Sequence, residues 1–314
     1  MTHASSRVLY HAPGDGLGHL VRAAWFLRTY FSDSELILSS NSSYLSDHRL
    51  KHFLPDQTSL LPLPSHRSVP ASSWQALLQR PIYDGLTHLC IDVFPLGLQG
   101  ELLGLHLPSS VQVWLISRRL KWAAYRAHLG DTMAQPPPFS SPCRQLVLEP
   151  LETEHEAFLM RLGSGSITCP TPIRSRITLT PAAREPLPAP VQEALDSVTQ
   201  PPWLIVHSGG REELEALVGY AHDLRTLEGH EGPLWLVTPE PLTDTSWLSP
   251  EVRCLSLWPV EALFAPAHRI VTACGFNLMQ ELRPWRYKHH FMPLPRRFDD
   301  QHWRARWHRT HPPA

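Results

Sequence analysis

The sequence predicts an α/β protein with two Rossmann-like domains that face each other across a cleft. Short apolar segments alternate with helix-like segments, which is the pattern of parallel sheets covered by helices. The alternation is interrupted once, by a segment rich in glycine, serine and proline around residues 162–172, and then starts again. The 314 residues are enough for two domains of ordinary size. We therefore expect an N-terminal domain of residues 1–165 and a C-terminal domain of residues 166–314, with the last helix as a candidate to pack back on the first domain.

The first domain is expected to begin with a parallel sheet. Short apolar runs typical of buried strands lie at residues 8–11, 35–39, 59–63, 87–92, 111–117 and 145–148. Residues 20–30 form the most regular helix pattern between them, because Leu20, Ala23 and Leu27 recur at helical spacing. Helices are also expected at residues 97–103 and 120–129.

The second domain repeats this architecture without repeating the sequence. Strands are expected at residues 203–207, 234–237, 252–257 and 269–272. Helices are expected at residues 212–227, 260–264, 277–283 and 299–307.

The composition argues against several classes of protein. Lys and Arg number 28 and Asp and Glu number 29, so the formal net charge of −1 argues against a protein whose main task is to coat nucleic acid. The first residues lack the apolar core of a signal peptide, and no segment reaches the roughly 18 to 20 apolar residues of a membrane span. The five cysteines are widely spaced and form no CxxC motif, which favours a cytoplasmic protein with reduced thiols.

The first motif is VLYHAPGDGLGHLVRA at residues 8–23, where a short strand enters a turn that contains Gly14, Gly16 and Gly18. His19 stands where the helix is expected to begin. Glycine permits close approach of the backbone, helix N-termini offer unpaired N–H groups to anions, and histidine titrates near neutral pH. The motif therefore indicates a functional loop, although alone it is also compatible with a simple tight turn. Its glycine spacing differs from the G-x-G-x-x-G fingerprint of dinucleotide-binding proteins.

The second motif is IVTACGFNLMQEL at residues 270–282, where a strand again ends in a glycine, Gly275. Asn277 is expected to be the N-cap of the next helix, whose N-terminus would present N–H groups to a phosphate. Glu281 lies one turn beyond Asn277 on the same face, and its carboxylate can accept hydrogen bonds from a ribose diol. The alternative is that Asn277 is only a cap and Glu281 a solvated helix residue.

The third motif is PLPRRFDDQHWRA at residues 293–305. Asp300 and Gln301 can cap the last helix, or they can bind sugar hydroxyls, which need paired donors and acceptors. The arginines of this tail can meet phosphate or an anionic membrane surface, or they can form a solvated helix face.

Together, the three motifs resemble those of nucleotide-sugar glycosyltransferases of the GT-B fold. The similarity is to the branch that contains the lipid II N-acetylglucosaminyltransferase, and within it to predicted glycosyltransferases that open with GxGLGHxxR. Those proteins also carry a D-x-F-P-x-G…E-L segment, which residues 92–97 match together with Glu101 and Leu102. The GLGHxxR element is shared with a sugar-nucleotide hydrolase of pseudaminic acid synthesis, in which the histidine is catalytic.

The resemblance implies that the first domain holds the acceptor and the second holds the nucleotide. Gly16, Gly18 and His19 would form a loop near the transferred sugar, and His19 is the leading candidate for acid–base catalysis. Asp92, at the end of a strand, is a second catalytic candidate or a cap of the loop that follows it. The remaining implied contacts are with the donor: His207, Ser208 and Gly209 at the diphosphate, Gly275 and Asn277 at the phosphate and sugar, Glu281 at the ribose, and Asp300 and Gln301 at the donor sugar.

The resemblance also implies an inverting transfer that needs no metal and no cofactor besides the nucleotide-diphosphate sugar, for which a UDP-sugar is favoured. The C-terminal histidines fit no compact set of metal ligands. Cys274 departs from the family pattern, in which glycine or serine is usual, and residues 283–288 are bulky and basic where a small turn is usual. These departures leave open a different choice of donor or a loss of activity. The alternatives to transfer are hydrolysis of a nucleotide-linked sugar and a catalytically silent protein that binds nucleotide sugars. The expected partners are this donor and an acceptor, with peripheral membrane contact as a further possibility and no nucleic acid.

Overall fold

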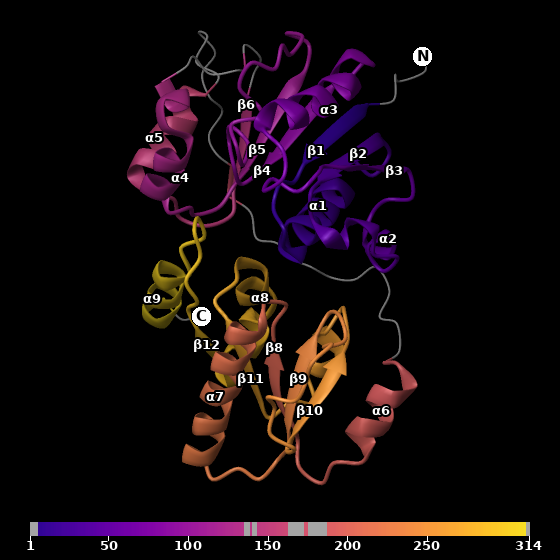
Figure 1. Cartoon of the computed structure of the whole chain (residues 1–314), viewed down its shortest axis with the longest axis vertical. Helices are drawn as coiled ribbons and strands as arrows, with labels where there is room; N and C mark the ends of the chain where they lie inside the picture. The colour runs from indigo at the N-terminus through magenta and orange to yellow at the C-terminus, as the bar shows by residue number, and fades with distance from the viewer. Residues whose placement is uncertain (1–5, 135–138, 140–142, 163–172, 175–186, 312–314) are drawn as a thin grey trace. The chain divides into compact units, whose positions relative to one another are not determined.

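The computed structural model of the chain describes residues 6–134, 139, 143–162, 173–174 and 187–311 (Figure 1). The chain divides into two compact units, Met1–Leu179 with Arg297–Asp300, and Thr180–Arg296 with Gln301–Ala314. The domain boundary expected at residues 165 and 166, and the connecting residues 163–172, lie outside the described part of the chain. Residues 297–300, which we call the strap, are grouped with the first unit although they lie near the C-terminus.

The first unit contains a parallel sheet with the strand order β3-β2-β1-β4-β5-β6-β7. Its strands are β1 (Arg7–His11), β2 (Glu35–Ser40), β3 (Thr58–Pro62), β4 (His88–Asp92), β5 (Gln112–Ser117), β6 (Cys143–Val147) and β7 (Ile173–Arg174). The six strands predicted in this half are confirmed. They are recognisable in the sequence because helices cover both faces of the sheet, so the strands are almost continuously apolar.

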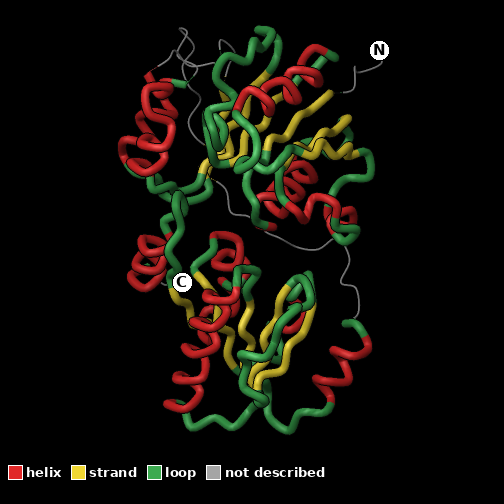
Figure 2. Tube along the Cα trace, in the orientation of Figure 1, coloured by secondary structure: helices red, strands yellow, loops and turns green. Residues whose placement is uncertain are grey.

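Helices connect these strands (Figure 2). They are α1 (Leu17–Tyr30), α2 (Leu50–Phe53), α3 (Ala71–Tyr83), α4 (Trp122–Leu129) and α5 (Thr153–Arg161), with short 3₁₀ helices η1 (Ser43–Ser46) and η2 (Gly130–Ala134). The predicted helix at residues 97–103 is wrong, because Gly97 and Gly100 adopt positive φ angles and the segment folds into successive turns. Helix α3 was not predicted, and it contains Pro81, a residue that usually ends helices.

The second unit contains a parallel sheet with the order β10-β9-β8-β11-β12. Its strands are β8 (Trp203–Val206), β9 (Leu234–Thr238), β10 (Val252–Ser256), β11 (Arg269–Ala273) and β12 (His289–Met292), and its helices are α6 (Ala189–Asp196), α7 (Arg211–Leu227), α8 (Phe276–Glu281), α9 (Gln301–Thr310) and the 3₁₀ helices η3 (Glu261–Leu263) and η4 (Arg283–Lys288). The helix predicted at residues 260–264 is the 3₁₀ helix η3. The helix predicted from residue 299 begins at Gln301, because the strap pairs with the first unit instead.

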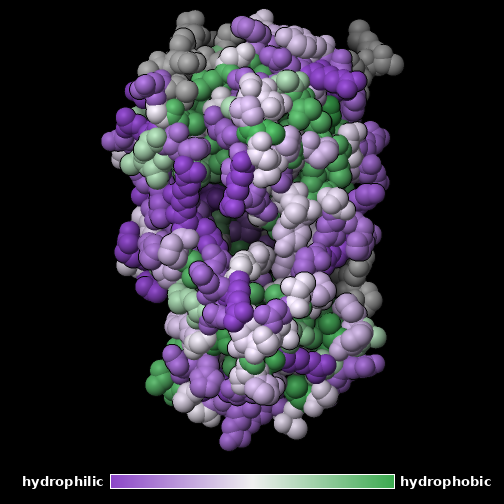
Figure 3. Space-filling view, in the orientation of Figure 1, coloured by the Kyte–Doolittle hydropathy of each residue, from purple (hydrophilic) through white to green (hydrophobic). Residues whose placement is uncertain are grey.

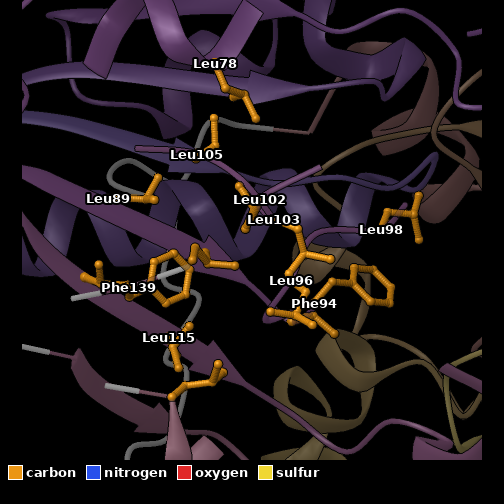
Figure 4. Packing of buried hydrophobic residues seen from close by; sticks show 14 of the residues in the cluster. Leu78, Leu89, Phe94, Leu96, Leu98, Leu102, Leu103, Leu105, Leu115 and Phe139 are labelled. Carbon is orange, nitrogen blue, oxygen red and sulfur yellow. The ribbon is translucent and has the colours of Figure 1, made fainter. Parts of the chain in front are cut away.

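Each unit has its own apolar core, and polar residues cover much of the face seen in Figure 3. In the first unit, the segment after β4 contributes a dense group of buried side chains, shown in Figure 4: Phe94, Leu96, Leu98, Leu102, Leu103 and Leu105. This packing fixes a loop that has no regular secondary structure.

Candidate active site

The strand order places the candidate site of the first unit at the point where the sheet changes direction. Counting outward from β1, the chain first adds β2 and β3 on one side and then β4 to β7 on the other. Open α/β sheets bind ligands outside the carboxyl ends of their strands at such a switch point. The first motif follows β1 and Asp92 ends β4, so the two catalytic candidates meet there.

His19 lies in the first turn of α1, which begins at Leu17 and not at residue 20 as predicted. Gly16 is the N-cap residue of this helix, and Gly18 lies in its first turn. The glycine on which the geometry depends is Gly14, whose φ is +142°. A Cβ atom there would lie 2.6 Å from Nε2 of His19, whereas a Cβ at Gly16 would meet nothing within 4 Å.

His19 and Asp92 form a hydrogen-bonded pair. The distance between Nδ1 of His19 and Oδ2 of Asp92 is 2.6 Å. An ionised carboxylate can only accept, so Nδ1 carries the hydrogen and Nε2 of a neutral His19 keeps its lone pair. The side chain of Asp92 is wholly buried, and that of His19 is 13% exposed. The imidazole ring that carries Nε2 is therefore mostly, but not completely, shielded from solvent.

Arg22 and Tyr10 hold the carboxylate of Asp92 from the other side. Arg22 donates from Nε to Oδ1 at 3.0 Å and from Nη2 to Oδ2 at 2.7 Å, and the hydroxyl of Tyr10 donates to Oδ1 at 3.1 Å. Burial alone would raise the pKa of Asp92, but the Arg22 charge and the hydrogen bonds from His19 and Arg22 hold that pKa well below its ordinary value. Asp92 is therefore ionised throughout the physiological range. Arg22 lies three residues after His19, on the same side of α1, and its role was not predicted from the sequence.

The surroundings of His19 favour the neutral imidazole. Burial lowers its pKa, and the charges of Arg22 and Arg118 lower it further, whereas the hydrogen bond and charge of Asp92 oppose this shift. Because Arg22 already neutralises the charge of Asp92, the main effect of the carboxylate is to orient the imidazole ring, and it does little to favour the protonated form. A neutral histidine with a fixed tautomer and a free Nε2 can take a proton from a hydroxyl group.

The loop after Asp92 is strained and well supported. Val93 is the one residue other than glycine with a positive φ, 68°, in the part of the chain that the structure describes. A β-branched residue in this region is costly and persists only where its surroundings impose it. The ring of Phe94, the next residue, stacks on the imidazole of His19 with 6.1 Å between the ring centroids. The hydroxyl of Tyr125 donates to the carbonyl of Gly97 at 2.7 Å and fixes the far end of the loop.

A buried histidine–glutamate pair lies beneath the same loop. Nε2 of His11 lies 2.8 Å from Oε1 of Glu101, and both side chains are completely buried. The carboxylate of Glu101 also accepts the backbone N–H groups of Leu98 at 3.0 Å and Gln99 at 2.7 Å. A Cβ at Gly97, where φ is +86°, would lie 2.3 Å from this carboxylate. The glycine and the glutamate of the D-x-F-P-x-G…E-L segment thus stabilise the loop through buried contacts.

In the second unit, the loop after β8 contains a second histidine–carboxylate pair. Nε2 of His207 lies 2.7 Å from Oε2 of Glu213, which also receives Nη2 of Arg296 at 2.7 Å. Burial lowers the pKa of His207 despite this partner. A Cβ at Gly209 would lie 2.0 Å from Oε2 of Glu213, so the pair requires glycine there, and Ser208 beside it is exposed. Glu213 and Arg296 were not predicted as parts of this loop.

The second motif follows β11, at the switch point of the second sheet. Its N-cap residue is Gly275, so the prediction that Asn277 caps the helix is wrong, and Asn277 lies inside α8. The helix starts earlier because Gly275 itself adopts the extended conformation of a cap residue. Glu281 is partly buried at the end of α8. Burial and the neighbouring charge of Glu261 raise its pKa to about 8.

Asp300 and Gln301 have protein partners of their own. The carboxylate of Asp300 lies 3.2 Å from Nε of Arg119 in the first unit. Oε1 of the buried Gln301 accepts the backbone N–H of Leu294 at 3.0 Å. Asp300 and Gln301 thus have different protein partners, and their proposed contacts with the donor sugar stay predictions.

Neither a metal cluster nor a membrane span is found within the described residues. They contain no group of three or more His, Cys, Asp and Glu side chains arranged to hold a metal ion. None of the helices described is long and apolar enough to cross a membrane.

Comparison with solved structures identifies the fold. UGT2 of Phytolacca americana, in complex with UDP-2-fluoro-glucose and pterostilbene, superposes with a TM-score of 0.61 at 13% identity, over 98% of this chain and 84% of that one. The chain has the GT-B fold. A putative UDP-N-acetylglucosamine 2-epimerase of Listeria monocytogenes gives a TM-score of 0.59 at 12% identity, over 94% and 81% of the two chains. The spinosyn forosaminyltransferase SpnP gives 0.55 at 15% identity, over 98% and 84%.

The sequence itself gives no such match. No protein-family profile matches the chain, and no curated protein matches it. The similarity to solved structures is thus a similarity of fold. At such low sequence identity, the reaction has to be inferred from the residues of the site and not from the fold.

Proposed function

We propose that this protein transfers a sugar from a nucleotide-diphosphate donor to an acceptor hydroxyl, with His19 as the general base. The observation that carries the proposal is the His19–Asp92 pair at the switch point of the first sheet, in which Nδ1 of His19 lies 2.6 Å from Oδ2 of Asp92. A neutral ring that donates from Nδ1 has Nε2 available as the proton acceptor. The fold supports it, because structures with this fold include one in complex with UDP-2-fluoro-glucose and pterostilbene.

The proposed chemistry is a single displacement. Nε2 of His19 accepts the proton of the acceptor hydroxyl while its oxygen attacks the anomeric carbon. The bond between that carbon and the phosphate oxygen breaks as the new bond forms, the nucleoside diphosphate leaves, and the configuration inverts. Asp92 holds the ring and stabilises the imidazolium that results. The transfer needs no metal in this scheme, because helix N-termini and backbone N–H groups of the loops would stabilise the departing diphosphate.

The second unit is proposed to hold the donor, preferably a UDP-sugar. Gly275 and the following turn would receive the phosphates, and Glu281 would bind the ribose diol. The loop of His207, Ser208 and Gly209 would contact the diphosphate, a role supported by its place after the central strand β8. The contacts of Asp300 and Gln301 with the donor sugar, and membership of the lipid II N-acetylglucosaminyltransferase branch, remain predictions from the sequence.

A two-step experiment tests the proposal. Thermal unfolding is first followed with UDP, GDP and TDP and with their sugars; at least one is expected to raise the melting temperature, and Glu281→Ala should remove that increase. Turnover of the stabilising donor is then measured with and without candidate acceptors. His19→Ala is expected to lower turnover by roughly a hundredfold or more while donor binding persists. If no donor raises the melting temperature, the proposed nucleotide site is wrong.

The same assay separates transfer from hydrolysis. Sugar release in water alone, unchanged by any acceptor, would assign the protein to the nucleotide-sugar hydrolases, where His19 would take its proton from water. Donor binding without turnover under all conditions would make the protein a nucleotide-sugar sensor.

A further inference from the structure

The strap is held on the first unit by several independent contacts. The backbone N–H of Lys121 donates to the carbonyl of Phe298 at 2.7 Å, and Asp299 forms an antiparallel bridge with Leu120. Asp299 also makes an ion pair with Arg118. Such a combination of backbone pairing and partly buried charge pairs specifies where the segment lies, which a loose surface contact would not do.

The ring of Phe298 fills an aromatic pocket of the first unit. It meets Phe94 edge to face with 5.7 Å between centroids, and Tyr125 in the same geometry at 6.0 Å. His128 lies 5.3 Å away on another side. Edge-to-face pairs at these distances are the favoured arrangement of aromatic rings and restrict how each ring can turn.

Phe94 is the link between this pocket and the candidate base. Phe94 stacks on the imidazole of His19, with 6.1 Å between the ring centroids and 19° between the ring planes, and it also contacts the ring of Phe298. Phe94 follows the strained Val93, which follows Asp92. A strained turn relaxes when the contacts that hold it are removed, and relaxation here would move the partners of His19 on two sides.

We propose that the strap is a positioning element for His19, and that Phe298 is its positioning residue, acting through Phe94. The inference rests on the proposed function only for the role of His19 as the base. The effect of Phe298 on the position of His19 is inferred from the ring contacts alone. A second route joins the strap to the same histidine, because Asp299 neutralises Arg118, whose charge acts on His19.

The titration of His19 reports this coupling directly. The charged and titratable groups that face it are Asp92 from β4, Arg22 from α1, Tyr10 from β1 through Asp92, and Arg118 after β5 with its strap partner Asp299. Loss of the Phe298 ring should let Phe94 turn away and water reach the imidazole. The pKa of His19 should then move back up toward its ordinary value, since burial is the largest cause of its decrease.

The experiment compares Phe298→Ala with a matched control, Phe158→Ala. Phe158 is also a partly buried ring of the first unit, and it packs on Trp122 of α4 with 4.9 Å between the ring centroids. Histidine Hε1 signals are followed by NMR across pH, and the His19 signal is assigned by its loss in His19→Gln. We expect a raised pKa in Phe298→Ala, an unchanged one in Phe158→Ala, and the wild-type value in Phe298→Tyr, which restores the ring.

Kinetics provide the second measurement. With the donor found above, kcat should fall roughly 10- to 100-fold in Phe298→Ala, because a small displacement of a catalytic group has effects of that size, while KM for the donor should stay within about twofold. Should Phe298→Ala not fold, Phe298→Leu keeps the apolar volume without the ring and is titrated instead.

An unchanged His19 titration in Phe298→Ala, or in Phe298→Leu if the alanine variant does not fold, would overturn the inference, and so would an equal change in Phe158→Ala. The NMR titration needs no substrate, so it remains decisive even if no donor is found and the proposed function fails.

Discussion

The buried pair of Arg22 and Asp92 permits a quantitative test that is independent of any activity. Replacing Arg22 by Met removes the hydrogen bonds of 3.0 and 2.7 Å and leaves a wholly buried carboxylate without its cation. Breaking a buried pair from one side costs about 3–5 kcal/mol, and Asp92→Leu should cost about the same because it strands the guanidinium. This is a large part of the roughly 5–15 kcal/mol that stabilises a domain.

The double variant Arg22→Met/Asp92→Leu should behave very differently from the sum of its parts. Both charges are gone, and the remaining loss is that of a hydrogen-bond acceptor for Tyr10 and His19, which costs about 1–3 kcal/mol. The coupling energy between the two substitutions is therefore expected to be about 3 kcal/mol or more.

Hydrogen exchange of peptides from β1 and β4 at pH 7.5 isolates the unfolding free energy of the first unit from that of the second. The exposed pair of Arg126 and Glu154, with 2.8 Å between Nη1 and Oε2, is the matched control in the same unit. Its cycle, with the same apolar replacements, should give about 0–1 kcal/mol. Additivity of Arg22→Met and Asp92→Leu within about 0.5 kcal/mol would refute the electrostatic account of the site.

Three further predictions concern single side chains. Gly14→Ala should displace His19, since its Cβ would lie 2.6 Å from Nε2, and should lower turnover and disturb the His19 Hε1 signal, whereas Gly16→Ala, with open space, should leave both near wild type. Burial lowers the pKa of His155 to about 4, and neither ring nitrogen has a hydrogen-bond partner among the described residues. The contribution of His155 to stability should therefore decrease as pH drops below about 6.5. His155→Phe should flatten that dependence and raise the unfolding free energy by about 1–3 kcal/mol, as measured by urea titration. Burial and a neighbouring carboxylate raise the pKa of Glu281 from 4.5 to about 8, so the contribution of this group to stability decreases as pH rises across that interval. Relative to the wild-type protein, Glu281→Gln should therefore become more stable as pH rises from 5.5 to 8.5, and an unchanged difference between the two would show that the carboxyl group is solvated.

The fold could be predicted because parallel strands covered on both faces leave an unmistakable apolar pattern. His19 and Asp92 were both predicted, but their contact was not, because residues 73 positions apart meet only through the strand order. The spacing of Arg22 from His19 was a usable signal, since residues three apart share a helix face.

Other errors came from long-range contacts that override local pattern. The segment at residues 97–103 has the composition of a helix, yet Glu101 accepts the N–H groups of Leu98 and Gln99 and bends it into turns. Residues 299 and 300 have the composition of a helix start, yet their carboxylates pair with arginines of the first unit. Nothing local in the sequence distinguishes these cases from the ordinary ones.

The strap also constrains how the chain can acquire its structure during synthesis. More than a hundred residues separate Leu179, the end of the first continuous part of the first unit, from Arg297. At about 5–20 residues per second, a ribosome needs roughly ten seconds to bridge that gap. Throughout this interval the pocket beside Phe94 lacks Phe298, and Arg118 lacks Asp299. The first unit to emerge is thus among the last to be completed, because these contacts of the loop beside His19 form only when nearly all of the second unit has been made.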